Sequence, residues 1–225
     1  MSFIRATAVA VAVAALAAPA TAATISFSDS IALTTTNWSD SFDIQRFDPL
    51  LGTLTSITFQ LSGTVTGNIR AESMDNAPST VSTNLQATIT LTRPDTTVLA
   101  VVLPVASFIN SFTAFDGTVD FGGTSGVTQL GATATSATTT VSPPPVSDLA
   151  LFTGIGSILL PAHANGSSNA SGSGNLITQF QTNAEASVTV TYTYTTATIE
   201  VPEPASLALF GAGLLGLGLV RRRRA

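Results

Sequence analysis

The segment Val188-Thr189-Val190-Thr191-Tyr192-Thr193-Tyr194-Thr195 alternates strictly between apolar or aromatic residues and threonine. A period of two places the valines and tyrosines on one face of an extended strand and the threonines on the other. β-Branched and aromatic side chains also favour strands. The segment therefore predicts a half-buried strand that ends a β domain.

Two earlier segments show the same alternation. Their apolar residues, which we expect to face the core, are Ile57, Phe59, Leu61 and Val65 in one segment and Leu85, Ala87, Ile89 and Leu91 in the other. The apolar run 97–105 predicts a central strand that is covered on both faces and ends at Pro104. An opening strand near Ile25 would carry Asp29 on its apolar face, so we expect a bulge or a strand end near Asp29.

Turn residues separate these runs, as at Asp116-Gly117 and in the proline run 143–145. One helical turn is expected at Asp148–Thr153, but no long segment has a helical period. Many short strands without amphipathic helices between them predict an all-β fold, an antiparallel β-sandwich or a jelly roll.

The N-terminal segment Met1–Ala22 has the pattern of a secretory signal peptide. A basic residue at Arg5 precedes an apolar stretch, which we expect to be helical, and Ala20-Thr21-Ala22 forms a small-x-small cleavage site for signal peptidase. The mature chain is then expected to begin at Ala23. A buried N-terminal helix is the alternative, but the segment shows no amphipathic period.

The C-terminal segment combines three features in a fixed order. Val201-Pro202-Glu203-Pro204 precedes an apolar run at 205–220, and four arginines follow it: Arg221, Arg222, Arg223 and Arg224. As a helix the run would span about 24 Å, less than the ~30 Å hydrocarbon core of a bilayer. It is therefore a marginal transmembrane anchor, and the arginines place its end in the cytoplasm and the body outside the inner membrane.

This order of a Pro-Glu-Pro box, a small-residue-rich apolar helix and a terminal arginine cluster resembles the PEP-CTERM sorting signal of Gram-negative bacteria. The resemblance implies recognition and removal of the tail by an exosortase in cells that secrete exopolysaccharide, after transient anchoring in the inner membrane. The final location would then be the cell envelope, the outer surface or the extracellular matrix. A plain single-span anchor is the alternative. The expected organisation is a signal peptide at 1–22, a β domain at 23–198 and a sorting tail at 199–225.

The β domain itself resembles the choice-of-anchor E family over residues 25–195. The segments that carry the resemblance are Ile25–Ser30, Phe47–Leu54, Ala114–Gly123 and Ser171–Leu176. The resemblance implies a secreted bacterial β domain attached to interchangeable surface-sorting tails. It implies no activity for particular residues.

The charge of the mature body excludes several classes of partner. The chain has no lysine, and residues 23–201 hold three arginines against twelve acidic residues, a net charge of −9. Nucleic acids and anionic membrane surfaces require cationic patches, so neither is an expected partner. The acidic surface favours solubility, with calcium binding as a minor alternative. The absence of cysteine excludes disulfides, thiolate catalysis and cysteine-based zinc sites.

No catalytic constellation stands out. We interpret His163, the single histidine, as a solvated loop residue, because no nucleophile elbow or orienting aspartate accompanies it. Asp116 with Asp120, or Asp40 with Asp43, could act as glycosidase pairs at about 5–9 Å separation, but turn formation explains Asp116 and Asp120 equally well. We therefore expect no catalytic, cofactor or metal residues.

Two further features bear on carbohydrate. Trp38 could stack on a sugar, although a single tryptophan more often packs in a core. Three glycosylation sequons begin at Asn37, Asn165 and Asn169. The resulting hypothesis is a non-enzymatic surface or matrix protein with a structural or adhesive role in biofilm and with exopolysaccharide as a partner. The alternatives are a carbohydrate- or calcium-binding module and a carboxylate-dependent polysaccharide hydrolase.

Overall fold

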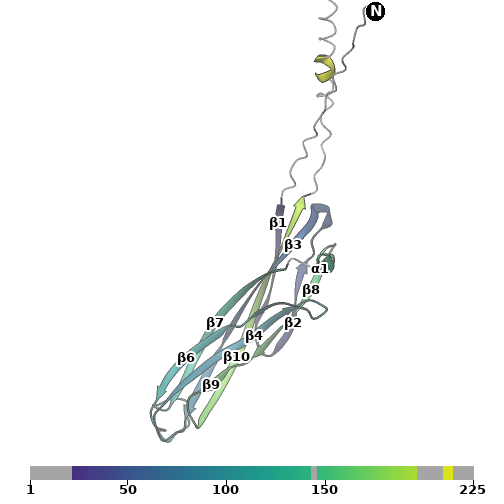
Figure 1. Ribbon diagram of the computed structural model, residues 1–225. Coiled ribbons are helices and arrows are strands. Elements are labelled where there is room, and N and C mark those ends of the chain that lie inside the picture. Colours follow the sequence, from purple (N-terminus) through teal and green to yellow (C-terminus); the bar gives the residue numbers. More distant parts are fainter. Residues whose placement is uncertain (1–21, 143–145, 197–209, 215–225) are drawn as a thin grey trace, which may run out of the picture. The chain divides into compact units, whose positions relative to one another are not determined.

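A computed structural model describes residues 22–142, 146–196 and 210–214 (Figure 1). Ala22–Thr195 forms one compact unit. The expected signal-peptide helix with Ala20 lies outside the described residues, whereas Ala22 begins the first strand and pairs with Thr195.

Ten strands build the compact unit. They are β1 (Ala22–Thr35), β2 (Trp38–Gln45), β3 (Gly52–Ser73), β4 (Ser79–Thr92), β5 (Val98–Val102), β6 (Val105–Phe112), β7 (Gly126–Ser142), β8 (Ser157–Gly166), β9 (Asn169–Ser171) and β10 (Leu176–Thr196). A 3-10 turn η1 (Pro49–Leu51) and a short helix α1 (Val146–Phe152) interrupt them.

The strands form two antiparallel sheets that pack together as a β-sandwich (Figure 1). The first, here the β10 sheet, has the order β1-β10-β3-β7. The second, the β4 sheet, has the order β2-β8-β4-β5, with β6 and β9 also paired to β4. The predicted all-β antiparallel sandwich is confirmed.

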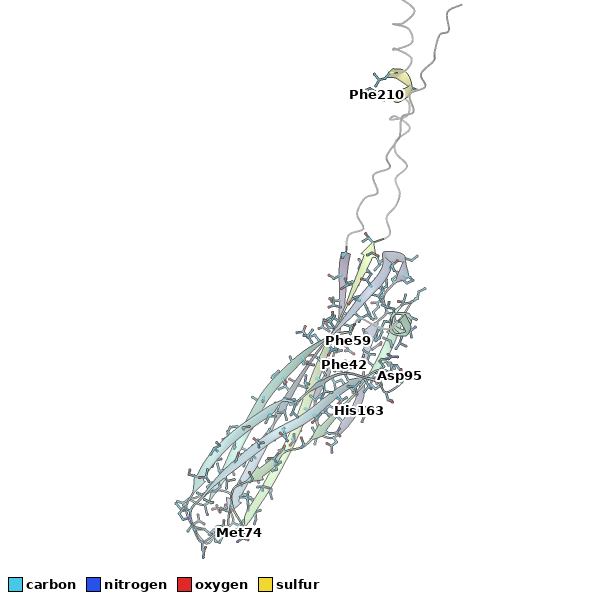
Figure 2. The ribbon with its side chains drawn as sticks, viewed as in Figure 1. Phe42, Phe59, Met74, Asp95, His163 and Phe210 are labelled. Atoms are coloured by element: carbon cyan, nitrogen blue, oxygen red, sulfur yellow. The ribbon has the colours of Figure 1, made fainter. Side chains whose placement is uncertain are left out.

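The core follows the sequence alternation. Every apolar residue predicted to face inward on β3 and β4 is at least 98% buried, and Val188, Val190 and Tyr192 on β10 are fully buried. Figure 2 shows Phe42 of β2 and Phe59 of β3 within this core. The Tyr192 hydroxyl donates to the Gln45 carbonyl at 2.9 Å, and burial raises the pKa of Tyr192. A core tyrosine with a satisfied hydroxyl ties the two sheets together.

The predicted helical turn is present as α1. Its last residue, Phe152, is buried and packs edge-on against Phe59 with ring centroids 5.4 Å apart. The backbone nitrogen of Phe47 donates to the Phe152 carbonyl at 2.8 Å. The helix therefore closes one end of the core with a single aromatic residue.

The apolar run 97–105 is not a central strand, which corrects the sequence prediction. It contains β5, the break at Leu103-Pro104 and the start of β6, and β5 and β6 both pair with β4 at the edge of its sheet. Pro104 lies between β5 and β6, and because proline has no backbone N–H to donate, it interrupts the ladder with β4 there. The run is apolar on its solvent face as well, and an unbroken apolar run alone does not separate an edge strand from a buried central one.

The irregularity expected near Asp29 is present in β1, but it does not lie at Asp29 itself. β1 continues in register through Asp29, and the irregularity comes later, between Ile31 and Thr34. The Asp29 carboxylate accepts a hydrogen bond from the backbone nitrogen of Asp43 on β2 at 2.7 Å. A carboxylate at an edge strand can face inward when a neighbouring backbone donor satisfies it.

Gly67 allows an unusually close approach between two strands of the β10 sheet. A Cβ atom at Gly67 would collide with the backbone carbonyl of Gln181 on β10 and lie 3.3 Å from the Thr182 Cα atom. Gly63, four residues earlier on β3, lies instead over the side chains of Ile89 and Val102 of the opposite sheet. Gly67 therefore allows the close spacing of β3 and β10, and Gly63 allows the close spacing of the two sheets.

In the C-terminal tail the structure describes residues 210–214, which are helical and fall inside the predicted helix 205–220. Phe210, marked in Figure 2, is 67% exposed, and Leu214 is exposed as well. Within the described residues, none of the helices has the length and apolar character needed to cross a membrane.

Candidate functional site

The solvent face of the β10 sheet carries many serine and threonine hydroxyl groups. Threonine and serine side chains on neighbouring strands hydrogen-bond in cross-strand pairs at 2.8–3.1 Å: Ser26 with Thr191, Ser28 with Thr189, Thr64 with Thr135 and Thr66 with Thr133. Such pairs stabilise a sheet surface without charge. The serines and threonines that alternate with apolar residues in the sequence thus form a hydroxyl surface. Each hydroxyl is both a donor and an acceptor, so a paired hydroxyl can still form a hydrogen bond with another group.

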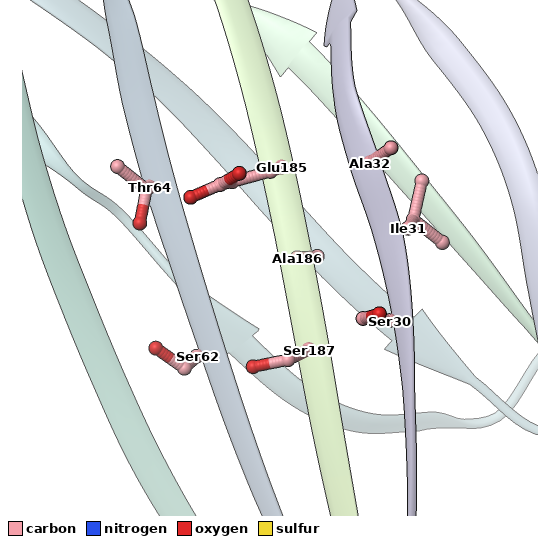
Figure 3. A pocket seen from close by; sticks show the side chains of 8 residues that line it. All are labelled: Ser30, Ile31, Ala32, Ser62, Thr64, Glu185, Ala186 and Ser187. Carbon is pink, nitrogen blue, oxygen red and sulfur yellow. The ribbon is translucent and has the colours of Figure 1, made fainter.

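A shallow hollow of about 250 Å³ lies on this face across β1, β10 and β3 (Figure 3). Its lining combines four hydroxyl side chains, two small apolar positions, Ile31 and Glu185: the hydroxyls belong to Ser30, Ser62, Thr64 and Ser187. Figure 3 shows the Glu185 carboxylate extending from β10 toward Thr64 on β3. The hollow is slightly smaller than the roughly 300–1,000 Å³ of a typical small-molecule pocket. Its chemistry suits hydrogen bonding to a polyhydroxylated ligand, and its lining includes no histidine and no second carboxylate.

A second hollow on the same sheet is lined by amides, Phe180 and Arg70. The Asn68 amide donates to the Gln181 side-chain oxygen at 3.0 Å, so part of its polar lining is internally satisfied. The sequence analysis did not single out either hollow, because both arise from strands that are distant in sequence.

Asp116 and Asp120 serve the loop that joins β6 to β7. Asp116 Oδ1 accepts from the Thr118 backbone nitrogen at 3.1 Å, and Asp120 Oδ1 accepts from the Gly122 nitrogen at 2.9 Å. Gly117 has a φ of +98°, which favours glycine. The turn interpretation of both aspartates is therefore confirmed, and each uses a carboxylate oxygen within its own turn.

Glu72 is a buried carboxylate that the sequence analysis missed. Its side chain is fully buried, and its two oxygens accept from the Phe121 backbone nitrogen at 2.7 Å and the Ser125 hydroxyl at 2.6 Å. It therefore fastens the loop before β7 to the end of β3. The sequence feature that could have indicated it is that Glu72 is the first acidic residue after Asp48 and lies in a strand otherwise rich in threonine.

Asp75 fastens a second loop at the same end of the sandwich. It accepts hydrogen bonds from the Ser173 hydroxyl at 2.7 Å and from the backbone nitrogens of Gly174 at 2.8 Å and Asn175 at 3.0 Å. These bonds, the Ser173 bond above all, lower the pKa of Asp75 because they stabilise the charged form. Near Met74, labelled in Figure 2, the loops are thus held by two carboxylates that face backbone donors.

Metal binding is a separate question for these carboxylates. Over residues 22–142, 146–196 and 210–214, no three histidine, aspartate or glutamate side chains gather closely enough to hold a metal ion. The carboxylates with described partners bond to nitrogen and hydroxyl donors of the protein.

His163 lies on a strand and not in a loop, which corrects the sequence interpretation. It is the seventh residue of β8, and its neighbours Ala162 and Ala164 are fully buried on the inner face. Proline and alanine gave the segment a loop-like composition, but the small alanine side chains fit between the sheets, whereas Pro161 is half-buried on the same face as His163. His163 Nδ1 contacts the Ser39 hydroxyl at 2.9 Å. A hydrolase triad uses Nε2 for the serine and reserves Nδ1 for a carboxylate, so this contact has a different geometry.

The other candidate residues of β2 do not form a site. β2 pairs with β8 without a break, so Asp40 and Asp43, three residues apart, project from opposite faces. Trp38 is buried, and its indole nitrogen donates to the Ala184 carbonyl at 3.0 Å, as expected for a core residue. Among the sequon asparagines, Asn37 accepts from the Gly166 backbone nitrogen at 2.7 Å.

The sorting residues lie outside the described part of the chain. They are Val201, Pro202, Glu203, Pro204, Arg221, Arg222, Arg223 and Arg224. A family model described as the PEP-CTERM protein-sorting motif matches residues 200–224. The chain carries a PEP-CTERM sorting motif. The motif supports an exported protein that is transiently anchored in the membrane and sorted by an exosortase, and its match begins four residues after β10 ends.

The PEP-CTERM match does not extend into the sandwich, and no curated protein matches the chain. Among solved structures, that of the infectious bursal disease virus Gx strain is 16% identical with a TM-score of 0.17, and the VP2 subviral particle of the same virus is 16% identical with a TM-score of 0.21. Each comparison covers 79% of this chain and 37% of the viral chain. The chain thus spans little more than a third of these structures, and TM-scores this low support no argument about fold or function.

Proposed function

We propose that the protein is a non-enzymatic component of the cell surface or extracellular matrix of a Gram-negative bacterium, with a structural or adhesive role in exopolysaccharide and biofilm. The observation that carries the proposal is the PEP-CTERM motif at 200–224, directly after a folded sandwich. A domain that is exported and then separated from its tail acts outside the inner membrane.

The sorting route follows from the two ends of the sequence. Signal peptidase removes Met1–Ala22, and the apolar run 205–220 holds the chain in the inner membrane with its arginines in the cytoplasm. Pro202 and Pro204 disfavour helix and keep the box extended, which suits the cleft of a processing enzyme. Exosortase cleavage near the box then releases the domain, in the way that other weak hydrophobic tails act as addresses and not as permanent anchors.

The assignment as non-enzymatic rests on what the candidate residues do. Asp116 and Asp120 bond to their own turns, and His163 contacts a serine through Nδ1. Their chemistry is therefore accounted for by the fold. For the sandwich we propose a choice-of-anchor E-like domain, a β module joined to an exchangeable tail.

The decisive test is the intact mass of the protein from the producing cell. The proposal expects a chain that begins near Ala23 and ends close to Pro202-Glu203-Pro204, without Arg221–Arg224. A native protein that keeps Ala225 and stays in the inner membrane of an exosortase-positive cell contradicts the sorting route. Gene deletion with measurement of biofilm mass and matrix composition tests the structural role separately.

A carbohydrate-binding function is the second candidate, favoured by the hydroxyl-lined hollow at Glu185. Calorimetry of the mature protein against the producer's exopolysaccharide, with and without calcium, measures it directly. Glu185→Gln should weaken such binding, and Glu185 is exposed, so the substitution leaves folding intact. The hydrolase alternative predicts release of reducing sugar that Asp116→Asn abolishes, and we expect no such release.

A further inference from the structure

The strands β5 and β6 form one long free edge of the β4 sheet. Ile89 of β4 pairs with Val102 of β5, and Gln86 pairs with Val105 of β6 in the same register, so the two short strands continue one line across Leu103-Pro104. β5 stands at the end of the strand order, and β6 pairs with β4. Among the strands that the structure describes, none pairs with the opposite side of this line.

This edge carries apolar side chains on its solvent face. Val101 is 46% exposed, Leu103 50% and Ile109 75%, and Val105 between them is half-buried. Their cross-strand neighbours on β4 are polar: Thr90 faces Val101, Gln86 faces Val105 and Ser82 faces Ile109. Natural proteins usually protect exposed edges with charge, so an apolar stripe at this place indicates a surface that is covered in use.

Charge distinguishes this flank from the opposite one. No charged residue occurs between Asp95 and Asp116, or in β7, whose contacts with β6 place it on the same side of the sandwich (Figure 1). The strands of the other flank, β1 and β2, carry Asp29, Asp40 and Asp43. In a body with a net charge of −9, two copies that approach through this flank bring no charged side chains of β5, β6 or β7 together.

Pro104 does not protect the free edge. Its carbonyl accepts a hydrogen bond from the Ala87 backbone nitrogen at 3.4 Å, so residue 104 turns its backbone groups toward β4. Backbone groups alternate in direction along an antiparallel strand. Those of Val105, Ser107 and Ile109 therefore point to the free side.

We propose that a second copy of this chain docks on this edge by antiparallel pairing of β6 with β6. A two-fold axis at Ser107 sets Ser107 opposite its own copy and Val105 opposite Ile109 of the second chain, so apolar side chains meet apolar side chains. Such an interface is isologous and joins the two β4 sheets into one. This inference goes beyond the sorting and matrix proposals and depends on neither.

The absence of cysteine from the sequence gives a direct test. Directly opposed residues in a hydrogen-bonded antiparallel pair have Cα atoms about 5.5 Å apart, within the range that a disulfide spans. Ser107→Cys in the purified full chain should form a covalent dimer on mild oxidation, seen by non-reducing electrophoresis. Ser30→Cys on β1 is the matched control, an exposed serine on an edge strand of the other flank.

The expected result is cross-linking at Ser107→Cys that exceeds the Ser30→Cys background at low micromolar protein. Adding Ile109→Lys, which puts two like charges into the interface, should reduce that cross-linking at least about tenfold. Sedimentation velocity of the cysteine-free chain should show the same dimer and the same loss with Ile109→Lys. Equal cross-linking at both positions, or a monomer throughout for the unmodified chain, overturns the proposal.

Discussion

Removal of the Glu72 carboxylate tests how the loop before β7 is held. Glu72→Ala deletes the acceptors of two hydrogen bonds, at 2.7 Å to the Phe121 nitrogen and 2.6 Å to the Ser125 hydroxyl. Hydrogen bonds to charged groups contribute about 1.5–3 kcal/mol each, and Ser125 is itself fully buried, so its hydroxyl would be left without an acceptor. We expect the free energy of unfolding to fall by about 3–5 kcal/mol. Glu72→Gln keeps one acceptor oxygen and should cost about half as much.

Urea unfolding and amide hydrogen exchange measure the two consequences of this change. The unfolding midpoint should drop, and the Phe121 amide should lose protection while amides in the middle of β10 keep theirs at low denaturant. Glu185→Ala is the matched control, because it removes an exposed glutamate from the outer face and should change stability by less than about 0.5 kcal/mol. A loss below about 1 kcal/mol for Glu72→Ala, or unchanged exchange at Phe121, refutes the clamp.

Three further predictions concern other parts of the chain. Gly67→Ala should destabilise the domain by at least about 2 kcal/mol in urea unfolding, since its methyl group meets the backbone of β10, whereas Gly63→Ala meets movable side chains and should cost less. The lowered pKa of Asp75 means that its contribution is present above its unfolded pKa, about 3.9, and is lost as pH falls through the folded value, so Asp75→Asn should flatten the acid side of the stability curve. Replacing Pro202 and Pro204 with alanine should extend helix upstream and accumulate a longer, membrane-retained form, seen by fractionation and intact mass.

The alternating strands could be predicted from sequence because their environment repeats every second residue. β3, β4 and β10 each show one face to the core along their length, so hydrophobic period alone assigned their inward residues. The run 97–105 misled the prediction because its apolar character has two sources, the core on one face and the uncharged edge on the other. Hydropathy shows that both faces of the run are apolar. It does not distinguish a face buried in the core from an apolar face exposed at an edge.

The loop clamps and the hollow could not be predicted for a different reason. Glu72 meets Phe121 and Ser125 about fifty residues later, and Glu185 lies beside Ser30 and Thr64 through pairing of β10 with strands from the start of the domain. These contacts depend on strand order, which a pattern along one segment does not contain. By contrast, Asp116 could be interpreted correctly because it bonds two residues away, within its own turn.

The charged residues of this lysine-free sandwich are unevenly distributed over its surface. Three acidic residues, Asp75, Asp116 and Glu72, bond to backbone nitrogens at loop ends and order the connections there. The broad face of the β10 sheet carries serine and threonine pairs instead. Hydroxyl faces interact with water and with one another without the repulsion that a charged sheet of one sign would carry. Acidic residues lie at the loop ends and on the β1–β2 flank, whereas strands β5 and β6 have none. The β5–β6 edge therefore has no charged side chain that would repel another strand. The uncharged β5–β6 edge is thus the part of the surface that we expect to associate. Ile109→Lys places a charge on that edge and should oppose the association.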